Sequence, residues 1–461
     1  MKHRVRSWWV EGEPWFLAVG LANLVLGTSS VLVPLALRAV LGRSVDSLGV
    51  LSSLVSVMGV AGSLVWGKLS DVANRRKPFV LLSYTAVAIL LGLMGFARSF
   101  EQLVVLNMAL NFFWVANASV TVLIVIENKA EGTWEKKIGH MNQIGALGWV
   151  FGLLVGSGAL AVAGRLASEA TAIRSTFVLL GVLGLVAALL AAKTIPAGAA
   201  RFFDRAFRGA AVSLGNFLVE FVRYGPLHLY YRLPVAGFVR YVLKMRAPRG
   251  LRTGTKRFLL ATLLAFIGLG MFGIPLPLLL AERFGIPSSS VFLYFAVQNA
   301  AVVVAYPLAT RRIHRTGNLR VQRAALAVRL VLFAGAAVAL SLTRVVPPAP
   351  LLVAIFAAYG FTWSYFQLSG VAITSRLARP ENRGLALGVY NGLAGTGWIL
   401  AGAGSGFLAR WAGYEAAFGA SAFFLLLTLV VLRFVPEPGS EAKGSSESRV
   451  MGTESAPAPT A

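Results

Sequence analysis

Two stretches of this sequence, GHMNQIGALGW at residues 139–149 and GVYNGLAGTGW at residues 388–398, decide the fold because they are copies of one pattern. Four positions match at a single offset of 249: Gly139 with Gly388, Asn142 with Asn391, Gly148 with Gly397, and Trp149 with Trp398. The same offset pairs Trp114 with Trp363, and an offset of 243 pairs Gly27 with Gly270 and Pro34 with Pro277. Two Trp pairs and an Asn pair in one register are not expected by chance, so the chain is predicted to contain an internal repeat.

The composition indicates that this chain is surrounded by lipid. Hydrophobic residues make up 57% of the sequence and charged residues only 13%, whereas about one quarter of a soluble domain is charged. In hydrocarbon, backbone amides must be paired within the chain, so each long apolar run should form a helix. The sequence therefore predicts an all-α membrane protein.

Twelve apolar runs are long enough to span a bilayer, which takes about twenty residues, and six of them fall in each copy of the repeat. They lie near residues 14–38, 47–67, 78–97, 101–126, 138–163 and 173–193, then 257–281, 288–310, 322–343, 349–375, 384–410 and 415–435. We expect two pseudo-symmetric six-helix bundles, 14–193 and 257–435, with an N-terminal segment (1–13), a linker (194–256) and a disordered tail (436–461). A repeat of six helices keeps its orientation, so a substrate site is expected between the bundles near mid-membrane.

The basic residues lie where they could contact anionic lipid headgroups. Lys and Arg number 43 against 18 Asp and Glu, and they gather between the apolar runs, which excludes a nucleic-acid partner and favours the lipid bilayer. With the N-terminus inside, the four short inner loops carry 15 basic residues and the outer loops 8. This asymmetry predicts a multi-pass protein of the cytoplasmic membrane with both termini in the cytoplasm. The basic, aromatic-rich linker at 194–256 is interpreted as amphipathic helices on the inner face, or alternatively as a poorly ordered segment.

Catalytic and metal chemistry find no support. The chain has no Cys and only four His, none with metal-ligand spacing, so we expect no disulfide, metal site or cofactor. No Ser/His/Asp or phosphate-loop constellation is present either. We therefore expect a protein that is not an enzyme, and we expect it to act as a monomer.

Two loops carry a family resemblance. Residues 67–77 read GKLSDVANRRK, which looks like the signature between helices 2 and 3 of the major facilitator superfamily, and RPENRG at 379–384 is similar to that family's loop before helix 11. The resemblance covers about 14–435 and implies transport by alternating access, with helices 1, 4, 7 and 10 lining a central cavity. The second copy of the signature, YPLATRRIHR at 306–315, lacks the Asp, helix 4 lacks the Arg of many proton-coupled members, and helix 5 lacks the Gly-Pro pair of antiporters. Coupling to a proton or another ion, and export, are therefore not implied.

Polar residues within the predicted spans are the candidate substrate site. On helix 4, Asn107, Asn111, Trp114, Asn117 and Thr121 fall within about one third of the circumference at 100° per residue, and such a face is costly toward lipid. Helix 10 mirrors it with Tyr359, Thr362, Trp363 and Gln367. The substrate-binding set is Asn23, Asn111, Trp114, Asn117, Trp149, Tyr359, Trp363, Gln367 and Trp398. The alternative for each amide is a helix–helix hydrogen bond, and for each Trp it is packing.

A cytoplasmic gate is expected at the helix ends. Asp71, Arg75 and Arg76 could latch onto a facing helix end, and Glu127 could pair with its repeat partner Arg376 across the two bundles. The alternatives are an ordinary positive-inside cluster and two solvated charges. The glycines of helices 5 and 11 are expected to allow close packing and sliding between the bundles, and Arg329 in helix 9 is expected to snorkel to the cytoplasmic surface.

These features predict a secondary transporter. No Asp or Glu lies near the centre of a predicted span, and such groups are the usual proton relays. An amide and indole lining suits a small neutral or amphipathic organic solute. Export is slightly favoured over uptake of a nutrient or metabolite, and the alternative from another class is a non-transporting receptor or scaffold on the same fold.

Overall fold

The computed structural model describes residues 13–73, 76–128, 134–196, 253–342, 346–378 and 383–436, and all regular elements there are helices. The first half contains α2 (Phe16–Ala39), α3 (Val45–Ala73), α4 (Lys77–Met94), α5 (Phe100–Asn128), α6 (Trp134–Leu166) and α7 (Glu169–Thr194). The second contains α11 (Thr253–Gly273), α12 (Leu276–Leu278), η2 (Leu279–Arg283), α13 (Ser288–Thr316), α14 (Asn318–Leu342), α15 (Ala349–Leu377), α16 (Arg383–Trp411) and α17 (Gly413–Arg433). The expected N-terminal segment, nearly all of the linker and the tail lie outside the described residues.

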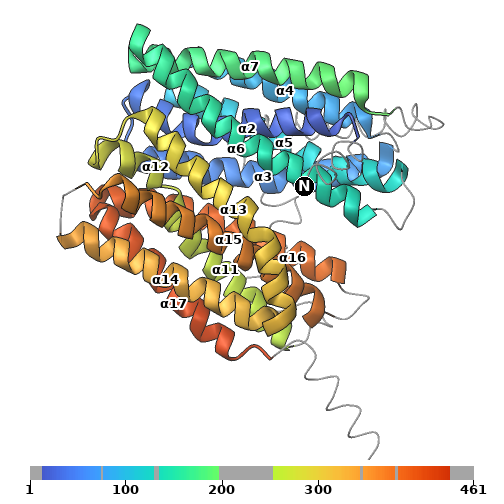
Figure 1. Ribbon diagram of the computed structural model, residues 1–461, viewed down its shortest axis with the longest axis vertical. Helices are drawn as coiled ribbons and strands as arrows, with labels where there is room; N and C mark the ends of the chain where they lie inside the picture. Colours follow the sequence, from blue (N-terminus) through green and yellow to red (C-terminus); the bar gives the residue numbers. More distant parts are fainter. Residues whose placement is uncertain are drawn as a thin grey trace, which may run out of the picture.

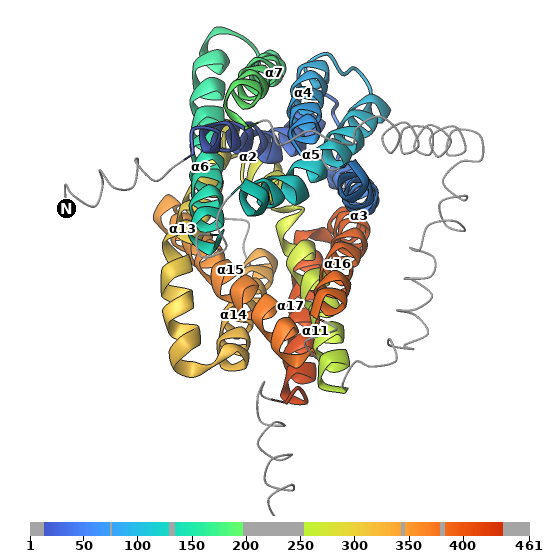
Figure 2. The ribbon, with the colours of Figure 1, turned by 90° about the vertical axis from the view of Figure 1, so that its right-hand side faces the viewer.

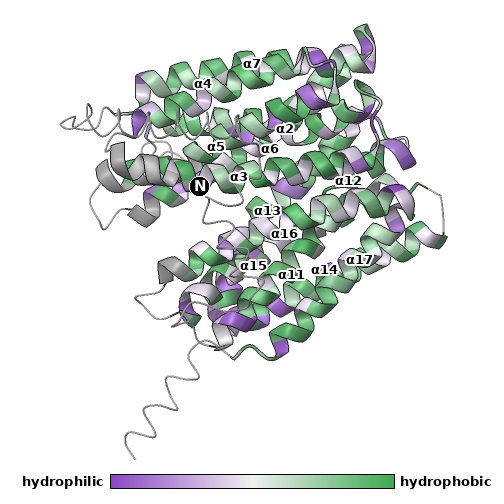
Figure 3. Cartoon of the chain, turned by 180° about the vertical axis from the view of Figure 1, so that it is seen from behind, coloured by the Kyte–Doolittle hydropathy of each residue, from purple (hydrophilic) through white to green (hydrophobic). Residues whose placement is uncertain are grey.

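Exposed apolar side chains cover the outer faces of the long helices. Apolar side chains on α7 and α14 are widely exposed, as at Leu189 (64%) and Val331 (72%). Figure 3 shows hydrophobic residues along the helices and hydrophilic ones mostly toward their ends. By length and composition, ten of the described helices could cross a membrane. Two further helices, α5 and α16, are each 29 residues long and pack against these ten. Exposed apolar surface on this scale requires a lipid solvent, so the predicted twelve-helix membrane fold is confirmed.

The two halves pack in the same way. In the first half α2 packs on α6 and α7, α4 on α5 and α7, and α3 on α5. In the second half the equivalent helices make the equivalent pairs: α11 with α16 and α17, α14 with α15 and α17, and α13 with α15. The halves meet where α3 packs on α16 and α6 on α13 (Figure 2). The duplicated sequence has therefore folded twice into one helix arrangement.

Residues matched by the repeat make matched contacts. A Cβ added to Gly27 would lie 2.9 Å from Cα of Trp149, and one added to Gly270 would lie 3.0 Å from Cε3 of Trp398. In both halves, a glycine on the first helix thus lets the tryptophan-bearing fifth helix pack closely against it. A side chain at either glycine would overlap the indole-bearing helix, which explains why Gly and Trp occur as a pair in each copy.

Among the residues that the structure describes, the two bundles are in close contact at one end. In Figure 1 they lie together at the left and diverge toward the right, the end at which α7 finishes and α11 begins, the two helices that the linker joins in the sequence. We call this the linker end and the other the opposite end. At the opposite end Ser53 donates a hydrogen bond to the Ile399 carbonyl (2.7 Å), and Ser157 donates one to the Ser289 carbonyl (2.9 Å). The molecule is therefore sealed across its halves at the opposite end.

Glycine residues let α3 and α16 approach each other closely in this seal. Cβ atoms added to Gly49 and Gly406 would lie 2.4 Å from the Gly402 carbonyl oxygen and 2.9 Å from the Val45 carbonyl oxygen, respectively. The expectation that glycines of helix 11 allow contact between halves is met for Gly402 and Gly406. The expectation for helix 5 is wrong for Gly148 and Gly152, whose added Cβ atoms would lie 2.0 Å from carbonyl oxygens of α2, in the same half.

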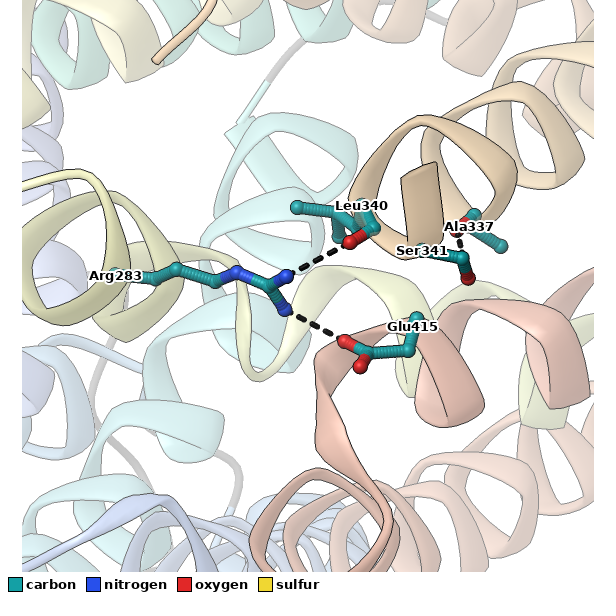
Figure 4. Close-up of polar contacts among 5 residues, drawn as sticks. All are labelled: Arg283, Ala337, Leu340, Ser341 and Glu415. Carbon is teal, nitrogen blue, oxygen red and sulfur yellow. Dashed lines mark hydrogen bonds and ion pairs between the residues drawn. The ribbon is translucent and has the colours of Figure 1, made fainter. Parts of the chain in front are cut away.

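Helix 7 is broken rather than continuous to residue 281. After α11 ends at Gly273, Pro275 precedes the short α12, and the π-helical η2 follows. A proline cannot donate to the helical ladder, so a break is expected there. The Arg283 guanidinium anchors η2 by donating to Glu415 (2.6 Å) and to the Leu340 carbonyl (2.7 Å), as Figure 4 shows. Helix 7 therefore ends in a separate segment tied to α17 and α14.

Candidate functional site

A cavity of about 400 Å³ lies between the two bundles. Helices α2, α5 and α6 of the first half and α13 of the second line it. The lining residues are Val19, Asn23, Trp114, Asn117, Thr121, Met141, Asn142, Gly145, Ala146, Trp149, Asn299, Val302, Val303 and Tyr306. None of these described residues is charged at neutral pH, and the set combines four amides with two indoles and a phenol. Such a lining offers hydrogen bonds and aromatic faces, with no fixed charge to neutralise.

The amides are held by their own helices. The Asn23 side-chain nitrogen donates to the Val19 carbonyl (2.8 Å), and that of Asn299 donates to the Phe295 carbonyl (2.9 Å). Each amide has two N–H donors and one carbonyl oxygen, so these bonds fix its direction and use one of the donors. Asn23 also packs against Gly145, where an added Cβ would lie 3.2 Å from the amide nitrogen. Gly145 therefore gives the amide its space between α2 and α6.

Asn117 is the most deeply buried of the four amides, at 3% exposed. Its side-chain oxygen makes no hydrogen bond, although its backbone carbonyl accepts one from the Thr121 hydroxyl (3.0 Å). A buried acceptor left without a donor is costly.

The second half reaches the cavity through α13. The Tyr306 hydroxyl, which lines the cavity, donates to the Gln367 side-chain oxygen on α15 (2.8 Å). Gln367 therefore contributes by positioning Tyr306, while Asn299 lies on the same face of α13. Residues 299, 302, 303 and 306 recur at helical spacing, so one stripe of α13 forms this wall.

Of the nine predicted substrate-binding residues, four line this cavity: Asn23, Trp114, Asn117 and Trp149. Asn111 lies instead against α3, where a Cβ added to Gly59 would be 3.1 Å from its side-chain oxygen. Trp398 packs against Gly270, and Trp363 packs edge-on against Phe266, with ring centroids 6.5 Å apart. The Tyr359 hydroxyl lies beside Gly273, at the break in helix 7. These last four residues pack around or near the cavity without lining it.

Arg329 contradicts the expectation that it snorkels. Its side chain is fully buried (0% exposed) and reaches α15, where Nη2 donates to the Tyr359 carbonyl (2.7 Å). The guanidinium carbon lies 4.6 Å from the centroid of the Tyr359 ring and 5.5 Å from that of Trp363. Nε and Nη1 make no hydrogen bond. The cation is thus held by aromatic faces and one carbonyl rather than by a carboxylate.

The two matched tryptophans therefore have different neighbours. Trp114 is stacked with Tyr84 of α4, with ring centroids 6.5 Å apart and planes 18° apart. At Trp363 the guanidinium carbon of Arg329, on α14, lies 5.5 Å from the ring centroid. Helices α4 and α14 are the third of each half. Each tryptophan therefore contacts the third helix of its own half, Trp114 through a phenol and Trp363 through a guanidinium.

The expected gate falls mostly outside the described residues, because the side chains of Asp71 and Glu127 and all of Arg75 lie there. Arg76 is described, at the start of α4, and Arg376 is exposed in the last turn of α15. Both are at the linker end. Neither the latch nor the Glu127–Arg376 pair is tested by these positions.

Four polar lining residues are absent from the predicted set: Thr121, Asn142, Asn299 and Tyr306. Thr121 does belong to the polar face predicted for helix 4. Asn142 carries a usable signal, because it matches Asn391 in the repeat. Asn299 and Tyr306 lie on one face of α13 (helix 8), and this face can be recognised as a lining only when the side of the helix that faces the cavity is known. The family arrangement of lining helices leaves helix 8 out, so the sequence directs attention away from this stripe.

Comparison with known proteins agrees with this geometry. The model of the Major Facilitator Superfamily matches residues 15–238 and 258–460. No curated protein matches the chain. Among solved structures, the nucleoside transporter NupG is 15% identical, with a TM-score of 0.67, covering 91% of this chain and 96% of its own.

Two further structures share the fold. The human organic anion transporter MFSD10 is 18% identical with a TM-score of 0.60, covering 91% of this chain and 98% of its own. A transporter of the POT family in complex with 5-aminolevulinic acid is 11% identical with a TM-score of 0.70, covering 92% of this chain and 95% of its own. At these identities the likeness concerns the fold alone. With the family model matched across both halves, the chain belongs to the major facilitator superfamily and is a multi-pass membrane protein, a secondary transporter of that kind.

Proposed function

We propose that the chain carries a small neutral or weakly polar organic solute across the cytoplasmic membrane by alternating access, with the cavity between the bundles as its binding site. The observation that carries this proposal is that both halves contribute polar groups to one uncharged cavity. A volume of about 400 Å³ is within the usual range of about 300–1,000 Å³ for small-molecule sites. Asn23, Asn117, Asn142 and Asn299 supply donors and acceptors, and Trp114 and Trp149 supply flat apolar faces.

The chemistry of the lining argues for a neutral solute. A cationic substrate would need a carboxylate in the cavity and an anionic one a Lys or Arg, and none lines it among the described residues. Arg329, a buried cation of the second half, lies against the rings of Tyr359 and Trp363 and does not line the cavity. Its hydrogen bond to the Tyr359 carbonyl points it toward α15.

Alternating access supplies the mechanism. The halves are sealed at the opposite end, whereas Asn142, Gln143 and Asn391 are exposed toward the linker end. With the linker end in the cytoplasm, as the basic loops predict, this is an inward-facing state. Rocking would part α3 from α16 at the opposite end and bring the linker ends together, where Asp71, Arg75, Arg76, Glu127 and Arg376 would form the cytoplasmic gate.

The test uses purified chain in liposomes. A thermal-stability screen against metabolites and drug-like compounds first finds a solute, because a ligand of the folded state raises the unfolding temperature. Asn142→Ala should then weaken binding and transport about threefold to tenfold, the effect of one lost hydrogen bond. Gln143→Ala is the matched control, since Gln143 is also exposed and does not line the cavity. Equal effects of the two variants would place the site elsewhere.

Oriented membrane vesicles with an imposed ion gradient read direction, because a carrier accumulates its solute only when a gradient drives it. Export, the direction favoured by the sequence, predicts accumulation by inside-out vesicles, and uptake predicts accumulation by right-side-out vesicles. A chain that binds the solute and moves none of it would be a receptor or scaffold on this fold, without the transport proposed here.

A further inference from the structure

A second, larger cavity lies on the outside of the second half. It measures about 1,220 Å³ and is bounded by α13, α14 and α15. Helices α13 and α14 both pack on α15 and pack little on each other, so the cavity is a groove with α15 as its floor and α13 and α14 as its walls. Its lining residues are Val297, Ala300, Ala301, Val304, Arg312, Thr316, Arg320, Val321, Ala324, Ala325, Val328, Ala357, Ala358, Phe361, Thr362 and Tyr365.

The groove is apolar along most of its length. Eleven of its sixteen lining residues are Ala, Val or Phe, and several are exposed, including Val304 (62%) and Val328 (47%). Small residues on the floor, Ala357 and Ala358, give it depth. Water has few partners on such a surface, whereas a hydrocarbon chain can fill it.

One end of the groove is cationic. Arg312 in the last turns of α13 and Arg320 in the first turn of α14 lie on either side of the turn at Gly317, where φ is 87°. They are the two charged members of the described lining, and both carry positive charge. Two guanidinium groups at the linker end of an apolar groove complement a molecule with an anionic head and a hydrocarbon tail.

We propose that this groove binds an anionic phospholipid, with its phosphate at Arg312 and Arg320 and an acyl chain along Val304, Val328 and Phe361. Basic pockets between transmembrane helices on the cytoplasmic side are suited to such headgroups. The N-terminus of α14 at Asn318 adds a favourable partial charge at the same place. A neutral lipid would fit the apolar walls equally well but would bring no net negative charge to the two arginines.

The groove shares a helix with the candidate transport site. Residues 299, 302, 303 and 306 of α13 face the central cavity, and residues 297, 300, 301 and 304 face the groove. At about 100° per residue these stripes lie on different sides of the helix. The lipid site is thus separated from the central cavity by α13 alone, and it stands whether or not the proposed solute is correct.

Native mass spectrometry of the full chain in detergent with added phosphatidylglycerol or phosphatidylcholine tests the proposal. We expect preferential retention of phosphatidylglycerol, and the double variant Arg312→Gln/Arg320→Gln should weaken its binding about tenfold or more. The matched control is Arg311→Gln/Arg315→Gln, which removes the same charge from exposed residues that do not line the groove. It should leave binding within about twofold of the parent.

A third variant tests the groove itself. Ala324→Phe places an aromatic ring in the groove from an exposed position on α14, so it should block the acyl chain and reduce retention while the chain stays folded and monodisperse. Equal losses in the two arginine variants would show attraction to overall surface charge and overturn the proposal. Equal retention of phosphatidylcholine, or full retention in Ala324→Phe, would overturn it as well.

Discussion

A methyl group at Gly49 should open the seal between the bundles. Gly49 lies on α3 at the opposite end, where α3 and α16 meet across the halves. A Cβ there would lie 2.4 Å from the Gly402 carbonyl oxygen and 2.8 Å from the Gly406 Cα. Both are backbone atoms and cannot rotate away. Ordinary contact begins near 3.4 Å, so Gly49→Ala requires the helices to separate by about 1 Å at this point.

The size of the effect follows from where the clash occurs. Overpacking of this kind costs about 1–3 kcal/mol. The contact exists only while the opposite end is closed, so the cost falls on that state and leaves the other unaffected. The ratio of closed to open states should therefore shift about 5-fold to 150-fold toward opening at this end. The gain in helix propensity from Gly to Ala applies to both states and cancels.

Distances between spin labels can measure this shift. The chain has no native Cys, so labels can be attached to cysteines replacing Arg43 and Ala412, exposed residues beside α3 and α16 at the opposite end. Gly49→Ala should increase the population at long distance. Gly404→Ala, on the same helix α16, is the control, because its Cβ would meet only the flexible end of Met271 at 3.4 Å. An unchanged distribution in Gly49→Ala, or the same shift in the control, would refute the reasoning.

Three further predictions follow from single contacts. Arg329→Met keeps most of the length of the side chain and removes a buried cation that has no acidic partner among the described residues, so the thermal midpoint of unfolding should stay equal or rise. Arg329→Ala should lower the midpoint, because it leaves a cavity. A clear fall for Arg329→Met would show that the charge itself stabilises the fold. Glu415→Gln should cost at most about 1 kcal/mol of unfolding free energy, because the Arg283–Glu415 pair is partly exposed and such pairs contribute little; a loss of several kcal/mol would mean that η2 depends on this ion pair. Solute flux into liposomes should proceed without an imposed pH gradient, since no carboxylate lines the central cavity among the described residues; strict dependence on the gradient would disprove this.

Much of the fold could be predicted because lipid narrows the choices. A long apolar run in hydrocarbon must be a helix, so the twelve runs correspond to twelve helical segments. The repeat also predicts that the two halves pair their helices alike, and the structure shows this in the contacts of Gly27 with Trp149 and of Gly270 with Trp398. Helix 7 is less predictable at its end, where Pro275 and the π-helical turn replace a continuous helix.

Side-chain direction is harder to predict than helix position. Asn111 and Asn117 share one face of α5, but that face is wider than the cavity, so Asn117 lines it and Asn111 lies against α3. The expectation for Arg329 rests on its distance from the helix end, whereas its surroundings depend on the rotation of α14, which turns it toward α15. Likewise, Gly148 and Gly402 both mark close helix contacts, and the sequence does not say that the first lies within one half and the second between halves.

Labelling of a cysteine in the cavity is the most direct test that this cavity binds the transported solute. In a chain without native Cys, a maleimide reagent reacts only at Asn142→Cys or, as a control, at Gln143→Cys. The solute should slow labelling of Asn142→Cys in proportion to its occupancy and leave Gln143→Cys unaffected. Labelling of Asn142→Cys at the same rate with and without saturating solute would contradict the proposed site.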